Sequence, residues 1–218
     1  MTSLKEEQEK TLQTPVLPAN IILQFFIKSM DIFYGKKRTL LKFKVLEVLA
    51  RYPYIAWEMG CYRKLTFLTT KERKADDQSV EKTCKTIDWA RKAYDNEQYH
   101  VLLIEELMSK KGLNQSGLMG SFLPRLLSLG YNTLSFMLYL IHPKWSYAMN
   151  AKFESHAEHE YMKMVSEHPE WEDEPVESKY FGANGYPKQE TLADLFRQIG
   201  LDERGHMLDS LQAIEDLN

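Results

Sequence analysis

Apolar residues recur every three to four positions along most of the chain, the spacing that one face of an α-helix requires. Ile22, Phe26, Met30 and Phe33 show this spacing near the start of the chain. Alternating patterns typical of half-buried strands are nearly absent. The chain therefore predicts an all-α fold. The predicted helices cover residues 21–34, 39–68, 78–110, 117–141, 144–168 and a last segment that begins at Thr191.

Proline, glycine and polar segments divide these helices. Pro53 falls inside the second predicted helix and predicts a kink there, because proline removes a backbone donor. Gly112 follows the third helix as its expected C-cap. Residues 168–189 (HPEWEDEPVESKYFGANGYPKQ) are acidic and turn-rich and predict a surface loop. We expect residues 1–18 to be a flexible N-terminal segment and residues 19–218 to form a single domain.

The composition excludes several classes of protein. Of the 218 residues, 44% are hydrophobic and 27% charged, a globular balance that argues against disorder. The net charge of -3 gives no support for a nucleic-acid partner. Two cysteines without a CxxC pair are too few for a zinc ribbon or a disulfide scaffold. Distinctive chemistry must therefore come from carboxylates, histidines and tyrosines.

Two segments are apolar enough to meet a membrane, residues 21–34 and 117–141. The longest uncharged run is Leu126–Ile141, 16 residues, whereas a spanning helix needs about 20. We expect monotopic insertion into one leaflet, with core packing as the alternative. The basic residues that follow the first apolar segment would then meet anionic headgroups; they are Lys36, Lys37, Arg38 and Lys42.

Two ExxH motifs carry the candidate chemistry. They are Glu97-Gln98-Tyr99-His100 and Glu203-Arg204-Gly205-His206. Positions i and i+3 share a helix face, so each motif can offer a carboxylate and an imidazole to one metal ion. Motif frequency alone does not decide the matter, and solvated Glu and His side chains remain the alternative at this point.

The order of the acidic residues favours a metal site. A glutamate in an apolar setting precedes each motif: Glu47 lies 50 residues before Glu97, and Glu154 lies 49 residues before Glu203. The order Glu, ExxH, Glu, ExxH is that of ferritin-like di-iron four-helix bundles. Two divalent ions would balance four buried carboxylates, and oxygen and nitrogen ligands suit iron or manganese. We therefore predict a ferritin-like four-helix bundle with two additional, membrane-facing helices.

Other residues compete for these roles. His156 and His159 form a rival i, i+3 pair, which we interpret as groups at the surface or beside the ligands. No HExxH motif occurs, which disfavours a zinc hydrolase. Three further glutamates compete for the first ligand position, Glu58, Glu105 and Glu106.

Four ordered segments resemble the signature segments of the alternative oxidase family, and most closely those of its plastid terminal oxidase branch. They are VLEVLARYPY (45–54), NEQYHVLLIEEL (96–107), ESHAEHEY (154–161) and DERGH (202–206). The similarity extends over about residues 31–211. It implies a membrane-bound di-iron oxidase domain that oxidises quinol and reduces O2 to water in a four-electron reaction, without pumping protons.

The resemblance also implies roles for individual residues. Tyr161, seven residues after Glu154, corresponds to the redox-active tyrosine. Lys42, where the family usually has arginine, contributes with Leu46 and Ala157 to the quinone pocket. We expect Glu154 to bridge the metal ions. The ligands of the two iron ions are then Glu47, Glu97, His100, Glu154, Glu203 and His206.

The expected partners follow from the same resemblance. They are O2, one leaflet of the bilayer and a quinol, with plastoquinol expected and ubiquinol as the other choice. The expected location is the thylakoid or cytoplasmic membrane of a cyanobacterial-type or plastid system. The oligomeric state stays open, with a homodimer as one option. The alternative function is a ferritin-like iron-handling protein or a soluble di-iron oxygenase, which the two apolar helices disfavour.

Overall fold

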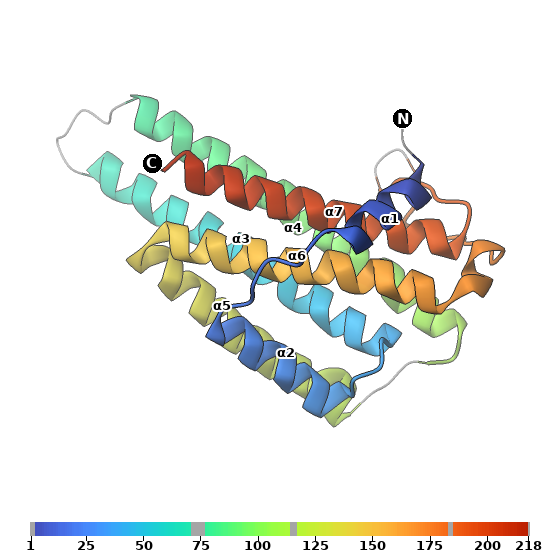
Figure 1. The fold of residues 1–218 in the computed structure, drawn as a ribbon. Helices are drawn as coiled ribbons and strands as arrows, with labels where there is room; N and C mark the ends of the chain where they lie inside the picture. The colour runs from blue at the N-terminus through green and yellow to red at the C-terminus, as the bar shows by residue number, and fades with distance from the viewer. Residues whose placement is uncertain (1–2, 71–76, 114–116, 183–184, 218) are drawn as a thin grey trace.

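The computed structural model describes residues 3–70, 77–113, 117–182 and 185–217, and helices dominate them (Figure 1). Apart from two isolated bridges, these residues contain no β-structure, so the predicted all-α fold is confirmed. The helices are α1 (Leu4–Gln13), α2 (Ile21–Tyr34), α3 (Leu40–Thr70), α4 (Asp77–Lys110), α5 (Leu123–Ile141), α6 (Pro143–Glu167) and α7 (Leu192–Glu215), with a π-helical turn (Leu118–Phe122) before α5 and a 3-10 turn (Pro169–Glu172) after α6.

Four long helices, α3, α4, α6 and α7, form the bundle that the sequence predicted. They pair mainly as α3 with α4 and α6 with α7 (Figure 1). Helix α3 continues through Pro53. Helix α4 ends near Gly112, whose φ of 66° suits glycine. Thr191 caps α7, because its Oγ1 accepts a hydrogen bond from the Asp194 amide at 3.1 Å.

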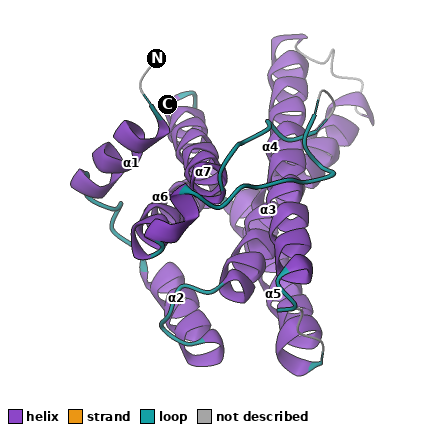
Figure 2. Cartoon of the chain, turned by 90° about the vertical axis from the view of Figure 1, so that its right-hand side faces the viewer, coloured by secondary structure: helices purple, strands orange, loops and turns teal. Residues whose placement is uncertain are grey.

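Helices α2 and α5 lie on the same side of the bundle, with their ribbons apart from each other (Figure 2). The Phe26 ring on α2 meets the Tyr131 ring on α5 edge-to-face at 4.9 Å between centroids. The outer face of α2 is apolar and exposed: Ile21 is 84%, Phe25 70% and Ile32 77% exposed. Among the described residues, none of the helices combines the length and hydropathy that crossing a membrane requires.

The N-terminal segment differs from the flexible segment predicted for residues 1–18, because residues Leu4–Gln13 form helix α1. A capping box starts this helix. The Ser3 Oγ accepts from the Glu6 amide at 3.2 Å, and Glu6 Oε2 accepts from the Ser3 amide at 2.9 Å.

Polar contacts hold α1 against α6 and α7. The Gln8 Nε2 donates to the Met162 carbonyl at 2.9 Å, and the Thr11 hydroxyl donates to Glu158 Oε1 at 2.7 Å. Arg204 on α7 also donates to this same Glu158 oxygen, at 2.8 Å. Gln8 and Thr11 are buried although both are polar. The hydrophobic pattern gave no sign of the packing because hydrogen bonds, rather than an apolar stripe, attach the helix.

Candidate metal centre

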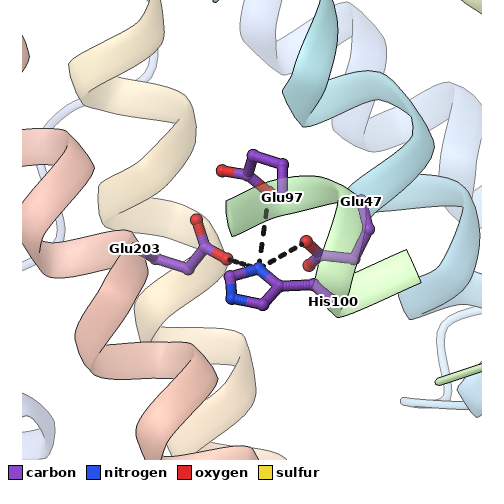
Figure 3. Close-up of side chains that lie close together, drawn as sticks. All are labelled: Glu47, Glu97, His100 and Glu203. Atoms are coloured by element: carbon purple, nitrogen blue, oxygen red, sulfur yellow. Dashed lines mark hydrogen bonds and ion pairs between the residues drawn. The ribbon is translucent and has the colours of Figure 1, made fainter. Parts of the chain in front are cut away.

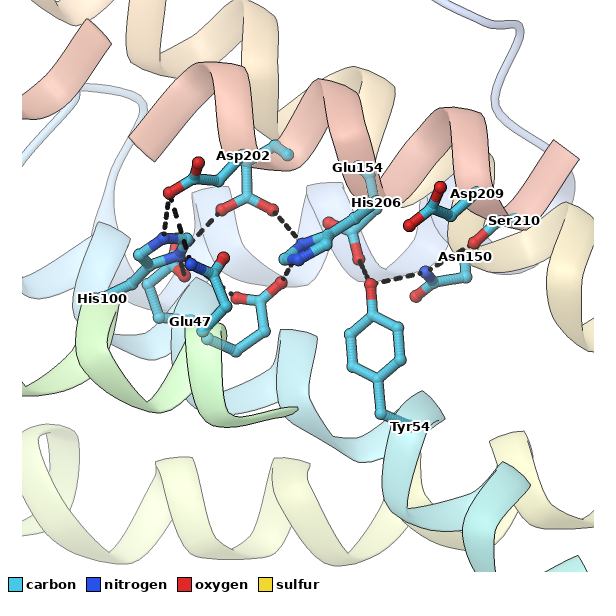
Figure 4. Close-up of polar contacts among 12 residues, drawn as sticks. Glu47, Tyr54, His100, Asn150, Glu154, Asp202, His206, Asp209 and Ser210 are labelled. Carbon is cyan, nitrogen blue, oxygen red and sulfur yellow. Dashed lines mark hydrogen bonds and ion pairs between the residues drawn. The ribbon is translucent and has the colours of Figure 1, made fainter. Parts of the chain in front are cut away.

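The six predicted ligands converge in the interior of the bundle. Each of the four bundle helices contributes: Glu47 comes from α3, an ExxH pair from α4, Glu154 from α6 and the second ExxH pair from α7 (Figure 4). All six side chains are buried. The i, i+3 spacing places both members of each pair on the inward face of its helix.

The ligand atoms form two overlapping groups, each with three carboxylates and one imidazole, in which all atoms lie within 4.8 Å of one another. Glu97 and Glu203 belong to both groups. Glu154, which the sequence analysis expected to bridge, belongs to one group only. The first group is Glu47, Glu97, His100 and Glu203, and the second is Glu97, Glu154, Glu203 and His206.

Each imidazole faces carboxylates from several helices. His100 Nδ1 lies 3.1 Å from Glu47 Oε2, 3.1 Å from Glu203 Oε1 and 3.5 Å from Glu97 Oε2 (Figure 3). His206 Nδ1 lies 2.8 Å from Glu97 Oε1 and 3.5 Å from Glu203 Oε2. Three carboxylates thus surround His100 Nδ1, and a cation bound by all four groups would stabilise this arrangement.

Several of these buried atoms make no hydrogen bond within the described part of the chain. They include both carboxylate oxygens of Glu97 and of Glu203, Glu154 Oε2 and His206 Nδ1. Buried polar atoms are normally hydrogen-bonded, so this set needs another partner. Burial, together with the neighbouring carboxylates, raises the pKa of Glu154 well above its ordinary value. The donor set therefore fits two divalent transition-metal ions, which would compensate four buried negative charges.

A hydrogen-bonded chain orients His100. Its Nε2 lies 3.1 Å from Asp202 Oδ2 (Figure 4). The Tyr186 hydroxyl donates to the same oxygen. Burial alone would raise the pKa of Asp202, but hydrogen bonds from His100, Tyr186 and Gln198 outweigh it and lower that pKa. With Nε2 engaged, Nδ1 faces the carboxylates. Sequence reasoning missed Asp202 and Tyr186, although Asp202 directly precedes Glu203.

Two buried tyrosines bond the carboxylates across the bundle. Tyr161 on α6 donates to Glu47 on α3, and Tyr54 on α3 donates to Glu154 Oε1 on α6 at 3.1 Å. Each tyrosine lies seven residues after a ligand of its own helix yet contacts the ligand of the other helix. Burial, and then the nearby carboxylates, raise the pKa of both tyrosines. The i+7 spacing that singled out Tyr161 would also have found Tyr54.

A cavity between α2, α3 and α6 lies beside the ligands. Leu46 and Phe153, the neighbours of Glu47 and Glu154 in sequence, line it. Lys42 also lines the cavity, whereas Ala157 is buried and is not among the lining residues. The other apolar lining residues are Leu23, Phe26, Ile27, Met30, Phe43 and Leu49, and the other polar ones are Asp31, Lys36, Arg38, His156 and Glu160.

Two of the basic side chains that line this cavity form ion pairs. Lys42 Nζ lies 2.6 Å from Asp31 Oδ1, and Arg38 Nε lies 2.9 Å from Glu160 Oε2. These two side chains are therefore paired within the protein, and their expected contact with lipid headgroups stays a prediction.

The competing candidates lie outside both ligand groups. The ring nitrogens of His159 lie 2.7 and 3.0 Å from backbone carbonyl oxygens, and His156 faces the cavity. The three rival glutamates pair with basic side chains: Glu58 with Arg91, Glu105 with Lys44 and Glu106 with Lys110.

Comparisons with known proteins give one family. The family model described as alternative oxidase matches residues 2–211. The chain is also 32% identical over 139 residues to the Arabidopsis thaliana protein "Ubiquinol oxidase 4, chloroplastic/chromoplastic". This match covers 64% of the chain and 35% of the relative, so it spans about a third of the relative's length.

Proposed function

The chain belongs to the alternative oxidase family, and we propose that it is a di-iron quinol oxidase that couples the oxidation of quinol to the reduction of O2 to water. The observation that carries this proposal is the cavity beside the two overlapping Glu/His groups. Leu46 lines the cavity while its neighbour Glu47 belongs to a ligand group. A quinol in the cavity would therefore be separated from the metal ligands by side chains of α3.

We propose that the two groups hold two iron ions. Glu97 and Glu203, which belong to both groups, would help to hold both ions, while Glu47 and Glu154 would each help to hold one. His100 and His206 would complete the ligand set. When bound, the iron ions would supply O2 binding and two of the electrons for its reduction.

The cavity suits a quinol because apolar walls surround a few polar groups. Side chains such as Phe26, Leu46 and Phe153 would contact the ring and its tail. Lys42 and His156 would hydrogen-bond the quinol oxygens. Ala157, the third residue expected in the pocket, is buried behind the residues that line the cavity and would act only through packing.

We assign Tyr161 as the residue that lends an electron and a proton. Its ring is fully buried and lies 4.5 Å from that of Phe43, a cavity-lining residue. Its hydroxyl donates to Glu47, so the carboxylate can accept the phenolic proton when the ring loses an electron. Tyr161 would thus stand between the quinol cavity and the ligands.

The exposed apolar face of α2, continued by exposed residues of α5, is proposed to enter one leaflet of the membrane. Leu126, Leu129 and Ile141 on α5 are exposed, as is the outer face of α2. The cavity lies beneath α2, so a quinol dissolved in the lipid would reach it directly. This arrangement favours quinol oxidation over soluble iron handling or oxygenation. Plastoquinol, a thylakoid or cytoplasmic membrane and a homodimer remain part of the proposal.

Oxygen uptake by the purified protein tests the proposal. The protein is loaded with iron in detergent, and O2 consumption is followed after addition of a plastoquinol or ubiquinol analogue. We expect uptake with at least one quinol and none without iron or in Glu203→Gln. Two bound iron ions per chain without quinol-driven uptake would favour an iron-handling role instead.

A further inference from the structure

A cluster of aromatic side chains extends from the ligand groups towards the surface, and the proposed oxidase reaction does not use it. Its members include Tyr54 and Trp57 on α3 and Trp89 on α4, and Tyr147 on α6 contacts both tryptophan rings, at 4.7 and 5.8 Å between centroids. Tyr54 and Trp57 are fully buried, and Trp89 is half-buried. These three residues therefore lead from the interior to a side chain that solvent reaches, Trp89.

Tyr54 is the inner end of this cluster. Its hydroxyl donates to Glu154 Oε1, and its ring centroid lies 5.5 Å from that of His206 (Figure 4). Asn150 Nδ2 also donates to the Tyr54 hydroxyl, at 3.2 Å. Tyr54 thus contacts two members of one ligand group while belonging to neither group.

The two tryptophans continue the contact outwards. The ring centroids of Tyr54 and Trp57 are 5.0 Å apart, and those of Trp57 and Trp89 are 5.0 Å apart in a stacked geometry. Tyr54 and Trp89 are also direct neighbours at 6.4 Å. Each ring in the series can lose an electron more readily than an aliphatic side chain or phenylalanine.

The two indoles differ in what their N–H groups face. Trp57 Nε1 donates to the neutral Ser146 hydroxyl at 2.7 Å, whereas Trp89 Nε1 donates to the Asp209 carboxylate at 3.2 Å. A carboxylate stabilises a positive charge on its partner and can accept its proton. An electron vacancy is therefore more stable on Trp89 than on Trp57, which directs it to the surface.

We propose that Tyr54, Trp57 and Trp89 form a path by which the metal centre draws an electron from the protein surface when O2 has reacted but quinol is scarce. The inference rests on the proposed function, because the oxidant is the iron centre after its reaction with O2. Its role is protective: the oxidising equivalent leaves the ligand region instead of damaging it.

The electrons and protons balance in three transfers. Tyr54 gives one electron to the oxidised centre and its phenolic proton to Glu154 Oε1. Trp89, directly or through Trp57, gives one electron to the Tyr54 radical, and the proton returns from Glu154. Trp89 passes its Nε1 proton to Asp209; an external one-electron reductant, such as ascorbate or a thiol, then supplies one electron and the proton returns from Asp209, which restores the indole. The net change is one electron moved from that reductant to the centre.

Another buried tryptophan is connected to the ligand region in a different way. Trp171, the other well-buried tryptophan among the described residues, packs on Phe196 at 5.0 Å, and Phe196 stacks on Tyr161 at 5.9 Å. A phenylalanine, which is hard to oxidise, thus separates Trp171 from the second tyrosine at the ligands. Trp171 is therefore a matched buried control that lacks the path.

The test measures where oxidation accumulates. Iron-loaded enzyme is exposed to O2 with limiting quinol, and peptide mass spectrometry quantifies oxidised tryptophan at Trp89, Trp145 and Trp171. We expect several-fold more oxidation at Trp89 than at Trp145, although Trp145 is 56% exposed and Trp89 less. Ascorbate should suppress the Trp89 product. Oxidation ordered by solvent exposure, or equal oxidation without iron, would overturn the path.

Two variants locate the cause. Asp209→Asn should lower oxidation at Trp89 severalfold without changing quinol-driven O2 uptake, and the control Trp145→Phe should leave Trp89 oxidation unchanged. Tyr54→Phe should lower Trp89 oxidation in enzyme shown to retain its iron. Unaltered Trp89 oxidation in Asp209→Asn, or in iron-replete Tyr54→Phe, would count against the path. Oxygen uptake in the same samples separates the claims, since its absence refutes the proposed function and the path together.

Discussion

The overlap of the two ligand groups predicts that two isosteric substitutions have unequal effects on metal binding. Glu97 belongs to both groups, whereas Glu154 belongs to one. Glu97→Gln and Glu154→Gln each remove one negative charge and keep the volume of the side chain. Both residues are fully buried, so any difference reflects their places among the ligands.

The expected magnitude follows from the ligands that remain. Glu154→Gln leaves the first group complete, with three carboxylates and His100, and reduces the second to two carboxylates and His206. Glu97→Gln reduces both groups to two carboxylates and one histidine. Substituting a residue that only hydrogen-bonds to a metal ligand typically lowers metal affinity by about 10–100-fold. Substituting a direct ligand should lower it by at least as much. Glu154→Gln should therefore retain roughly one ion per chain, and Glu97→Gln clearly less than one.

The assay counts metal per folded chain. Protein is loaded anaerobically with iron, freed of loose metal by gel filtration, and analysed by mass spectrometry of the elements, with circular dichroism to verify helix content. Glu58→Gln is the control, because Glu58 pairs with Arg91 outside the site. Equal losses in Glu97→Gln and Glu154→Gln would refute the shared role of Glu97, as would two ions retained in Glu97→Gln.

Three further outcomes are expected. Tyr161→Phe should keep its iron and lose at least about tenfold in quinol-driven O2 uptake, because it loses only the hydroxyl bonded to Glu47 and keeps the ring volume; parent-rate uptake in an iron-replete sample would show that the phenol only packs. Phe25→Glu should weaken binding to lipid vesicles in a flotation assay, since it places a charge on the exposed apolar face of α2, and undiminished flotation would argue against that face as the membrane contact. Gln8→Ala removes three side-chain hydrogen bonds, one of them from the Arg197 guanidinium. The free energy needed to detach α1 from the bundle should therefore fall by about 3 kcal/mol. Amide hydrogen exchange of α1 should then be on the order of a hundredfold faster, and unchanged exchange would show that these bonds do not hold the helix.

The fold was largely predictable because its helices bury apolar stripes. The segment predicted as 78–110 corresponds to α4, Asp77–Lys110, and Thr191 was correctly placed at the start of the last helix. Helix α1 was not predictable in this way. Its buried side chains, Gln8 and Thr11, are polar and are held by hydrogen bonds to residues about 150 positions away in the chain.

The six candidate ligands could be chosen from the sequence because spacing along a helix determines which residues share a face. Spacing does not determine which carboxylates meet across the bundle. The bridging role was therefore assigned to Glu154, whereas Glu97 and Glu203 are the residues common to both groups. For the same reason the contact of Tyr54 with Glu154 was missed, because it joins α3 to α6.

The central claim is that this chain reduces O2 to water with electrons from quinol, and the ratio of quinol oxidised to O2 consumed tests it most directly. Purified, iron-loaded protein is supplied with a quinol analogue while quinone absorbance, O2 and hydrogen peroxide are followed together. The account predicts two quinols oxidised for each O2, no accumulation of hydrogen peroxide, and no reaction in Glu203→Gln. One quinol for each O2 with hydrogen peroxide as product, or no quinol oxidation by iron-replete protein, would contradict it.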